Sequence, residues 1–303
     1  MVGSVGRIIA ADKSSFSPAL YEADAHYIIP GIDEAGYIEA VTEICRKEKI
    51  NAVLSLIDPE LSVLAENREV LAETGAVFVA SGPEQIRTAY DKKLMNEWLA
   101  KHGYSRAAAY YSLQDAEQAY GNSEIRFPMI IKPIKGSASV NCREVYDMQE
   151  AAFFMSRTPG LMIQEYIAGD EIGTDVYVDM LSGKVVSVFL KKKILMRAGE
   201  TDKAVSIRDE ELRSYVAGFA EAFGARGPLD VDIIAKDGQY FITDVNPRFG
   251  GGYPFAHRCG CDHIQMIVNN LNGIENLPGN DTYEENVSLM KYSDVLTVRG
   301  DRI

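Results

Sequence analysis

The stretch from Val231 to Gly252 reads VDIIAKDGQYFITDVNPRFGGG and predicts two extended strands joined by a tight turn. VDII and YFITDV are the strands, and residues 236–239, Lys-Asp-Gly-Gln, provide an Asp-Gly turn of the kind that closes a β-hairpin. Side chains on a strand alternate between its two faces. Asp244, Asn246 and Arg248, spaced two residues apart, are therefore expected to project toward one side of the hairpin.

The two strands of this hairpin contribute one carboxylate each, Asp232 and Asp244. Most charged hairpin faces are only solvated, and that interpretation stays open for this stretch taken alone. Against it, the residues between the charges are apolar, and Asn-Pro-Arg-Phe followed by three glycines is an unusual end for a solvent-exposed strand. Carboxylate and amide oxygens suit Mg²⁺, which binds through one or two carboxylates plus substrate phosphates. We therefore expect a Mg²⁺-nucleotide site, with the phosphate and base contacts supplied elsewhere in the chain.

The composition is that of an ordinary globular protein large enough for two or three domains. Of 303 residues, 47% are hydrophobic and 25% are charged, and 44 acidic against 31 basic residues give a formal charge of −13. Such a charge disfavours nonspecific binding to nucleic acid or to an anionic membrane, so neither is expected as a partner. The first residues lack the apolar core of a secretory signal, and no stretch is apolar for long enough to span a bilayer.

The cysteines are few and scattered, at Cys45, Cys142, Cys259 and Cys261. This usage predicts reduced thiols and a cytoplasmic protein. The last two cysteines are separated by one glycine, but no second Cys/His pair stands at zinc-binding spacing, so a metal role for them is not favoured.

Residues 7–80 alternate short apolar runs with amphipathic segments. RIIAA, HYIIP, AVLSL and AVFVA are the strand candidates, and residues 37–49 and 59–74 form the helices between them. This alternation predicts a parallel sheet covered by helices. A βα domain ordinarily opens with a strand and a helix ahead of RIIAA, so a Rossmann-like domain with a truncated start is one interpretation of residues 1–89.

A helical segment follows over residues 83–101, with Pro83 in its first turn and Gly103 as its stop. Lys92 comes directly after Asp91, where a second helix could begin. A lysine in such a place is usually exposed to solvent, so a ligand role for Lys92 depends on what the other motifs supply.

A strand and a small-residue loop form the next motif, RFPMIIKPIKGSASVNC. PMII delivers Lys132 at its end, and Gly136, Ser137, Ala138 and Ser139 follow within a few residues. Small residues let backbone N–H groups approach phosphate oxygens, and a lysine adds a point charge. The GxxxxGK[ST] order of a Walker A loop is absent. A hairpin turn with a lysine at the end of a strand is the alternative.

Residues 161–180 read LMIQEYIAGDEIGTDVYVDM and predict two strands joined by a turn. Residues 164–167, Gln-Glu-Tyr-Ile, could present backbone and side-chain groups to an adenine edge, and Glu171 could accept hydrogen bonds from ribose hydroxyls. Acidic residues after a turn are mostly only solvated. The polar run from Arg197 to Lys203 is expected to be a loop, either a substrate lid or a mobile surface loop.

Two further helices and a short sheet segment are expected downstream. The helices cover residues 210–223 and 263–271, and the tail, residues 285–303, is expected to give two short strands.

Taken in chain order, these motifs resemble the ATP-grasp superfamily, in particular single-chain members similar to the synthetase domains of the carbamoyl-phosphate synthase large subunit. The likeness covers nearly the whole chain and implies an α/β and α+β protein. Residues 1–89 resemble the preceding α/β domain, and residues 90–303 resemble the ATP-grasp fold, with two α+β subdomains at about 90–165 and 166–303.

The resemblance assigns roles to particular residues. Asp232 takes the first metal-ligand position, and Asp244-Val-Asn246 takes the second, with Asp in place of the commoner Glu. Arg248 matches the arginine near the transferred phosphoryl group, where Lys132 is the second catalytic residue. The ATP contacts implied are Lys92, Lys132, Gly136, Ser137, Ala138, Ser139, Glu165, Tyr166, Ile167 and Glu171, with Asp170 close enough to exchange roles with Glu171.

The chemistry that the resemblance implies is ligation of a small-molecule carboxylate to an amine, or to a thiol, through an acylphosphate, with ATP converted to ADP and phosphate. ATP and Mg²⁺, with Mn²⁺ as an alternative, are the expected cofactors, and a homodimer is one option for assembly. Carbamate or bicarbonate phosphorylation, and a non-catalytic ATP-binding regulatory module, stay open as alternatives. The substrate candidates, chosen by location only, are Arg197, Lys203, Tyr253 and His257.

Overall fold

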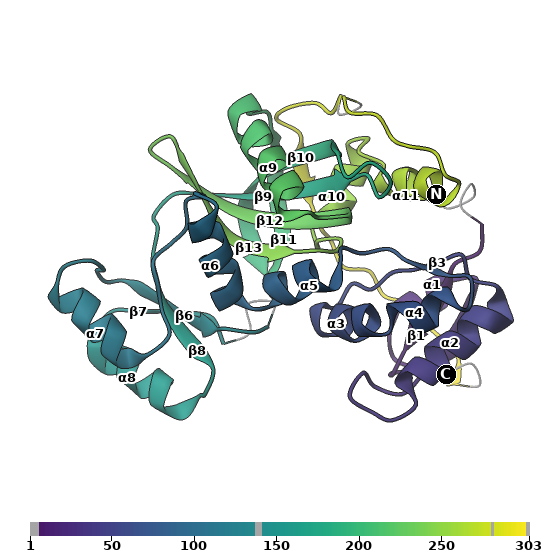
Figure 1. Cartoon of the computed structure of the whole chain (residues 1–303), viewed down its shortest axis with the longest axis horizontal. Coiled ribbons are helices and arrows are strands. Elements are labelled where there is room, and N and C mark those ends of the chain that lie inside the picture. The colour runs from purple at the N-terminus through teal and green to yellow at the C-terminus, as the bar shows by residue number, and fades with distance from the viewer. Residues whose placement is uncertain (1–5, 137–140, 280–281, 301–303) are drawn as a thin grey trace.

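The computed structural model describes residues 6–136, 141–279 and 282–300. Its chain forms an N-terminal α/β region, a small four-stranded sheet with two helices, and a large six-stranded sheet (Figure 1). The expectation of an α/β domain followed by two α+β parts is confirmed.

The N-terminal region alternates short strands and helices, as predicted. Its strands pair parallel, but the single sheet that was predicted is found as two separate two-stranded sheets, one from β1 and β2 and one from β3 and β4. Helix α3 supplies the buried core residues Leu61 and Leu64, which pack with Leu71 and Phe78. The elements are β1 (Ile9–Asp12), α1 (Ala19–Glu22), β2 (Ala25–Ile28), α2 (Tyr37–Glu48), β3 (Ala52–Val53), α3 (Asp58–Glu66), α4 (Arg68–Ala72) and β4 (Val77–Phe78).

Two of the predicted helices are interrupted by a single polar residue. Asn67 breaks the helix expected over residues 59–74 into α3 and α4, and its side-chain Nδ2 donates to the carbonyl of Val63 at 2.9 Å. Asp91 separates α5 (Pro83–Tyr90) from α6 (Lys92–Lys101). Its carboxylate accepts from the backbone N–H groups of the second and third residues of α6, which is the usual role of an N-cap. Lys92 is thereby fixed as the first residue of α6.

The small sheet is antiparallel, in the order β5-β8-β6-β7. Helices α7 and α8 lie side by side against it (Figure 1), and their Ala116 and Ala151 pack on Ile131 and Ile163 of the strands. Lys132 follows Ile131, so strand alternation turns it away from this core. The elements are β5 (Ala109–Tyr110), α7 (Leu113–Gly121), β6 (Met129–Pro133), β7 (Arg143–Val145), α8 (Met148–Arg157) and β8 (Leu161–Glu165).

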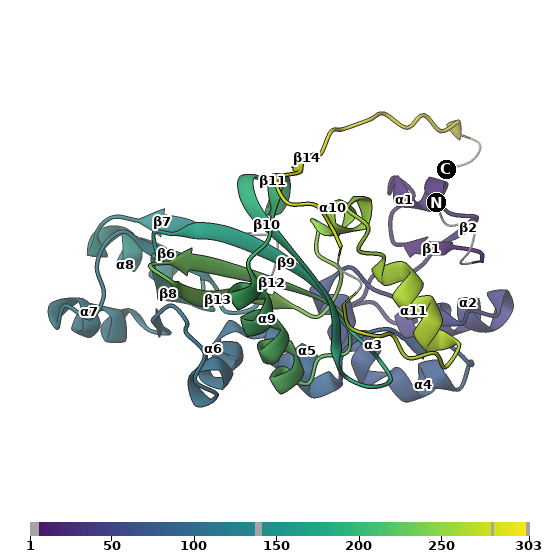
Figure 2. The same ribbon diagram turned by 90° about the horizontal axis from the view of Figure 1, so that it is seen from above.

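The large sheet has the strand order β13-β12-β9-β10-β11-β14, and helix α9 lies along one of its faces (Figure 2). That face is apolar: Leu229, Val231 and Ile233 alternate along β12 and pack in the core that includes α9. The elements are β9 (Asp170–Val178), β10 (Val185–Arg197), β11 (Glu200–Ile207), α9 (Glu210–Phe223), β12 (Gly227–Lys236), β13 (Gln239–Asn246), α10 (Tyr253–Arg258), α11 (His263–Leu271) and β14 (Ser288–Met290). The opposite face of β12 therefore carries its acidic residues.

Two predictions about the later part of the chain are wrong. The run from Arg197 to Lys203 is not a loop, because β10 and β11 form a hairpin whose turn is only Ala198 and Gly199. Both residues have positive φ, 50° and 78°, which is the geometry of a tight two-residue hairpin turn. In the tail, β14 is the single strand among the described residues 285–300, which continue beyond it without joining a sheet (Figure 2).

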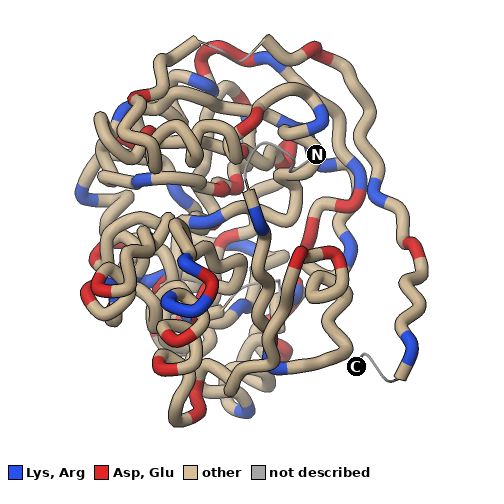
Figure 3. Tube along the Cα trace, turned by 90° about the vertical axis from the view of Figure 1, so that its right-hand side faces the viewer, with Lys and Arg blue, Asp and Glu red and all other residues tan. Residues whose placement is uncertain are grey.

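The charged residues are spread along the chain. In Figure 3 lysines and arginines are interspersed with acidic residues along the described trace. Within that part of the chain, no helix combines the length and apolar character needed to cross a membrane.

Candidate active site

A cleft of about 850 Å³ separates the two larger sheets and is closed at one end by the N-terminal region. Strands β6 and β8 contribute one wall, and the charged face of β12 and β13 contributes the other. Residues 56–58, which lead into α3, complete the end near Arg248. The cleft therefore brings together residues from all three parts of the fold.

The two carboxylates of the hairpin are neighbours on adjacent strands, because Asp232 on β12 pairs in register with Asp244 on β13. The pairing depends on an irregularity: Ile233 pairs with Ile242, so Thr243 is an extra residue on β13. This β-bulge lets Ile242 and Val245 both enter the apolar core while Asp244 points into the cleft. Strict alternation from Ile242 would have turned Asp244 into the core.

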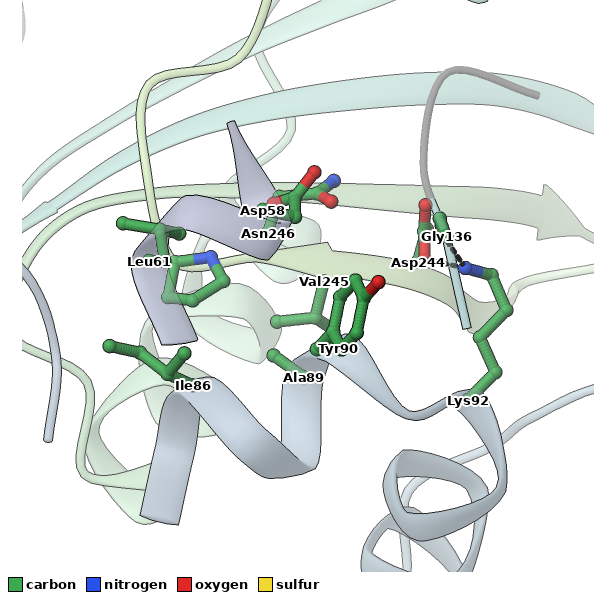
Figure 4. Close-up of a pocket in the computed structure, with 11 residues that line it drawn as sticks. Asp58, Leu61, Ile86, Ala89, Tyr90, Lys92, Gly136, Asp244, Val245 and Asn246 are labelled. Atoms are coloured by element: carbon green, nitrogen blue, oxygen red, sulfur yellow. Dashed lines mark hydrogen bonds and ion pairs between the residues drawn. The ribbon is translucent and has the colours of Figure 1, made fainter. Parts of the chain in front are cut away.

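Two lysines neutralise these carboxylates. Nζ of Lys193 lies 2.7 Å from Oδ1 of Asp232, and Nζ of Lys92 lies 3.5 Å from Oδ1 of Asp244. Lys92 also donates to the carbonyl of Gly136 at 2.7 Å, so the start of α6 is tied to the loop after β6 (Figure 4). Each carboxylate keeps more than a quarter of its side chain exposed, 29% for Asp232 and 28% for Asp244, so both are open to a ligand.

Lys132 projects from β6 across the cleft toward β13. Its Nζ donates to the carbonyl of Thr243 at 3.4 Å. Burial lowers the pKa of Lys132, the charge of Asp244 opposes that effect and the charge of Lys92 adds to it. A cation held at a desolvated site gains from an additional anionic partner, which a phosphate group could provide.

The remaining predicted ATP residues fall into two groups. Glu165, Tyr166, Ile167 and Glu171 line the cleft at the end of β8 and the start of β9. Asp170 instead pairs with Lys192 at 2.7 Å, so Glu171 is the acid that faces the cleft. Gly136 lines the cleft as well, whereas Ser137, Ala138 and Ser139 lie outside the described residues.

The substrate candidates are not brought together. Tyr253 lines the cleft, but its hydroxyl is used within the protein, where it accepts from the backbone N–H of His263 at 2.9 Å. Arg197 and Lys203 flank the hairpin tip and do not line the cleft, whereas Glu200 and Thr201 between them do. His257 lies away from the cleft lining, with Nδ1 3.6 Å from Oδ1 of Asp262. Of the four candidates only Tyr253 lines the cleft among the described residues, because hairpin pairing and helix α10 direct the other three elsewhere, and a substrate role for any of them stays a prediction.

Lys193 is a cleft residue that the sequence analysis missed. It stands on β10 and reaches Asp232 on β12 by crossing the intervening strand β9 at Gly173. A Cβ on Gly173 would lie 3.1 Å from Cε of Lys193, so the missing side chain opens the path. The signal was present in FLKKKILM, because Lys191 and Lys193 share one face of a strand whose other face is largely buried.

Asp230 is a second missed residue, two positions before Asp232 on the same face of β12. Its Oδ2 accepts from Nδ2 of Asn246 at 3.2 Å. Burial and the neighbouring charge of Asp232 raise the pKa of Asp230 to about 7. Asp230 thus orients the amide of Asn246, while its surroundings disfavour its charged form.

The three glycines that end the hairpin motif each approach a charged side chain. A Cβ on Gly250 would lie 2.5 Å from Oδ1 of Asp230, and one on Gly251 would lie 2.7 Å from Cδ of Glu200. A Cβ on Gly252 would lie 2.9 Å from Nζ of Lys191. The glycine run is therefore required for the chain to cross the charged face of the sheet at close range.

A Gly250→Ala substitution tests this close approach. The added methyl group would meet the buried carboxylate of Asp230, so we expect the free energy of unfolding to fall by about 1–3 kcal/mol. Urea denaturation measures the change. Gly218→Ala in α9 is the matched control, since its Cβ meets nothing within 4 Å and alanine favours a helix interior by about 0.5–1 kcal/mol. Equal stability of the Gly250→Ala variant and the native protein would contradict the packing argument.

A buried histidine behind the cleft gives the fold a pH dependence. Burial lowers the pKa of His263 to about 3, helped by the charges of Lys191 and His257, and its Nε2 lies 2.8 Å from Oγ of Ser187. The unfolded chain takes up this proton near the ordinary pKa of about 6.5. Between these two pKa values the unfolded state binds more protons, so stability is lost as the pH falls.

We expect the native protein to lose about 1.4 kcal/mol per pH unit below pH 6 relative to a His263→Gln variant. Urea denaturation of both proteins between pH 7 and pH 4 measures this difference, in which the contributions of other titrating groups cancel. Parallel pH profiles of the two proteins would show that His263 does not stay neutral in the folded state.

The donor set of the cleft fits a hard cation bound together with phosphate. Asp232, Asp244 and Asn246 offer carboxylate and amide oxygens from adjacent strands. Over the ranges 6–136, 141–279 and 282–300, no three His, Cys, Asp or Glu side chains converge to hold a metal ion by themselves. Mg²⁺ typically binds through one or two carboxylates and completes its shell with substrate phosphates and water.

Comparison with known families agrees with this arrangement. The ATP-grasp domain family matches residues 89–252, more than half of the chain, and the PylC-like N-terminal domain family matches residues 2–79. The chain therefore belongs to the ATP-grasp family, and the resemblance inferred from its motifs is confirmed.

The relatives that match include carbamoyl phosphate synthase large chains. The protein from Clostridium beijerinckii is 24% identical over 247 residues, which is 73% of this chain and 22% of the relative. The protein from Methanosarcina mazei is 26% identical over 279 residues, 82% of this chain and 25% of the relative. The chain thus spans about a quarter of the length of these relatives.

Solved structures share the fold at low sequence identity. The biotin carboxylase domain of Hydrogenobacter thermophilus 2-oxoglutarate carboxylase, solved with MgADP and bicarbonate, has a TM-score of 0.72 at 18% identity, covering 95% of this chain and 69% of that one. An L-amino acid ligase from Bacillus licheniformis has a TM-score of 0.66 at 15% identity, covering 92% of this chain and 78% of that one.

Proposed function

We propose that this chain binds Mg²⁺-ATP in the cleft and transfers the γ-phosphoryl group to a small-molecule carboxylate, giving an acylphosphate that an amine or a thiol then displaces. The observation that carries the proposal is the pairing of Asp232 with Asp244 on adjacent strands, directly across the cleft from Lys132. Phosphoryl transfer needs charge neutralisation and alignment, and little covalent help from the protein.

The side chains have separable roles in this proposal. Lys132 and Lys92 neutralise phosphate oxygens, and Arg248 stabilises charge on the transferring group. Glu165 to Ile167 meet adenine, and Glu171 accepts from the ribose hydroxyls. The backbone of Gly250 to Gly252 lines the cleft beside the hairpin, where the carboxylate substrate would bind.

Asp232, Asp244 and Asn246 would hold the metal ion, which when bound supplies positive charge to the phosphate oxygens. Lys193 and Lys92 pair with these same carboxylates, so binding of the metal ion would compete with the two ion pairs.

A second candidate is phosphorylation of bicarbonate or carbamate. It is favoured by the matching carbamoyl phosphate synthase relatives and by the bicarbonate named with the biotin carboxylase neighbour. Both candidates use the same ATP site, and they differ in the acceptor that makes ADP formation possible. A non-catalytic ATP-binding module is less favoured, because both carboxylates and Asn246 are present and face the cleft.

The experiment is a screen for ADP formation and product mass. Amino acids are supplied singly and in pairs as acid and amine, with simple thiols as alternative acceptors, in bicarbonate-free buffer and again with bicarbonate added. ADP formation that needs an acid–amine pair, with a product mass equal to their sum minus water, supports the ligase. ADP formation that needs only bicarbonate supports the second candidate, and bound Mg²⁺-ATP without ADP formation under any condition supports the non-catalytic module.

A further inference from the structure

An ion pair between Asp58 and Arg248 joins the N-terminal region to the hairpin side of the cleft. Asp58, the first residue of α3, accepts two hydrogen bonds from the guanidinium of Arg248, from Nε to Oδ1 at 2.8 Å and from Nη2 to Oδ2 at 2.7 Å. The two residues are 190 positions apart in sequence, and their side chains are only 7% and 12% exposed. Figure 4 shows Asp58 beside Asn246, across from Asp244 and Lys92.

We propose that Asp58 is a positioning residue: it holds Arg248 in the orientation that binds the transferring phosphoryl group, and so makes phosphoryl transfer depend on the N-terminal region. The inference rests on the proposed function, since it names a further residue of the same site. A bidentate carboxylate–guanidinium pair fixes the plane as well as the position of the guanidinium, which a single hydrogen bond would not do.

The turn that carries Asp58 is itself held by hydrogen bonds. Ser55 accepts from the backbone N–H of Ile57 at 3.1 Å, and its hydroxyl donates to the carboxylate of Glu60. The hydroxyl of Tyr37, on α2, donates to the other oxygen of Glu60 at 2.6 Å. These contacts lie within the N-terminal region, so the turn that carries Asp58 has hydrogen bonds of its own besides the pair with Arg248.

Arg248 is restrained from its own side as well. Its Nη1 donates to the carbonyl of Phe249 at 3.0 Å, and its backbone N–H donates to the carbonyl of Asn246 at 2.8 Å. A guanidinium has five N–H groups, of which Asp58 takes two and Phe249 takes one. Among the described residues the other two N–H groups make no hydrogen bond, and Arg248 lines the cleft.

The first test removes the charge of Asp58 while keeping its size. A 1 Å misplacement of a catalytic group can cost about 100-fold in rate, so we expect Asp58→Asn to lower kcat for ADP formation by about that factor. We expect KM for ATP to change by less than about threefold, since the lost interaction acts in the transition state. In an Arg248→Ala background the same substitution should have less than about a twofold effect. An equal loss in both backgrounds would overturn the proposal.

Glu66→Gln is the matched control, because it removes an exposed carboxylate at the other end of α3 without touching Arg248 or the turn that holds Asp58. We expect it to keep kcat within about threefold of the native value. A loss as large as that of Asp58→Asn would show that any carboxylate lost from this helix has the same effect, and the positioning role would be rejected.

A second measurement does not depend on turnover. The Nε–H of Arg248 is observable by NMR and can be assigned by its absence in Arg248→Lys. We expect its exchange with solvent to be at least about tenfold slower in the native protein than in Asp58→Asn. Equal exchange rates would overturn the proposal. Slow exchange in a protein that forms no ADP with any acceptor would reject the proposed ligase function alone.

Discussion

An Asp244→Ala variant is expected to lose ATP turnover, with ADP formation lowered by about a thousandfold or more, while remaining folded. Asp244 is the carboxylate that the bulge at Thr243 turns into the cleft, directly opposite Asp232. Without it, one carboxylate and one amide remain for the metal ion, and Lys92 loses its partner at 3.5 Å. The measurement is ADP release with the acceptor found in the screen, together with circular dichroism and urea denaturation of the variant.

The expected stability of this variant separates a functional residue from a structural one. The pair of Asp244 with Lys92 is long and partly exposed, so its loss should change the free energy of unfolding by no more than about 1 kcal/mol. Undiminished turnover by a folded Asp244→Ala protein would contradict the assignment of the metal site. A matched control is Asp294→Ala, which removes an exposed acid outside the cleft.

Much of the cleft could be predicted because its motifs are local. An Asp-Gly turn between alternating apolar residues specifies a hairpin, and Asp237 and Gly238 indeed have φ values of 50° and 74°. A run of apolar residues ending in lysine and followed by small residues specifies a strand and a close turn, as at Lys132. These patterns depend only on residues that are close in sequence, so they can be recognised without knowledge of the tertiary structure.

Contacts between distant segments left no comparable signal. Asp58 begins a helix after a short strand and has the appearance of an ordinary first-turn acid. Its pairing with Arg248 depends on how the N-terminal region packs on the hairpin. The hydrophobic periodicity of the sequence does not predict that packing. The prediction of a loop from Arg197 to Lys203 was wrong for a local reason. Its charged residues were interpreted as irregular structure, although Ala198-Gly199 supplies the tight turn of a hairpin.

The bulge at Thr243 shows how a correct prediction can rest on an incomplete reason. The alternation of Asp244, Asn246 and Arg248 was sound, but it does not extend back to Ile242, because Thr243 shifts the phase of the strand by one residue. Its hydroxyl donates to the carbonyl of Asp232 at 3.1 Å and its own carbonyl accepts from Lys132. The same irregularity thus turns Asp244 into the cleft and accepts a hydrogen bond from Lys132.

A Lys132→Met variant is expected to be far less active and no less stable than the native protein. Methionine keeps the length of the side chain and removes the charge, so we expect kcat/KM for ATP to fall by about 100- to 1000-fold. Burial lowers the pKa of Lys132, which means that the folded protein disfavours the charged form. Replacing a buried charge by an apolar group of similar size is often neutral or stabilising by about 1 kcal/mol or more.

The opposite directions of these two effects make the test specific. Thermal denaturation and ADP release are measured on the same preparations. The control is Lys184→Met, which removes a lysine from an exposed ion pair, since Nζ of Lys184 lies 3.3 Å from Oε2 of Glu221. If Lys132 only supported the fold, its replacement would lower stability and activity together. Native activity in Lys132→Met would show that the phosphates do not lie against β6. We expect a large loss of activity at equal or higher stability. Burying the charge of Lys132 lowers the stability of the folded protein, and the same charge is expected to bind the phosphates of ATP.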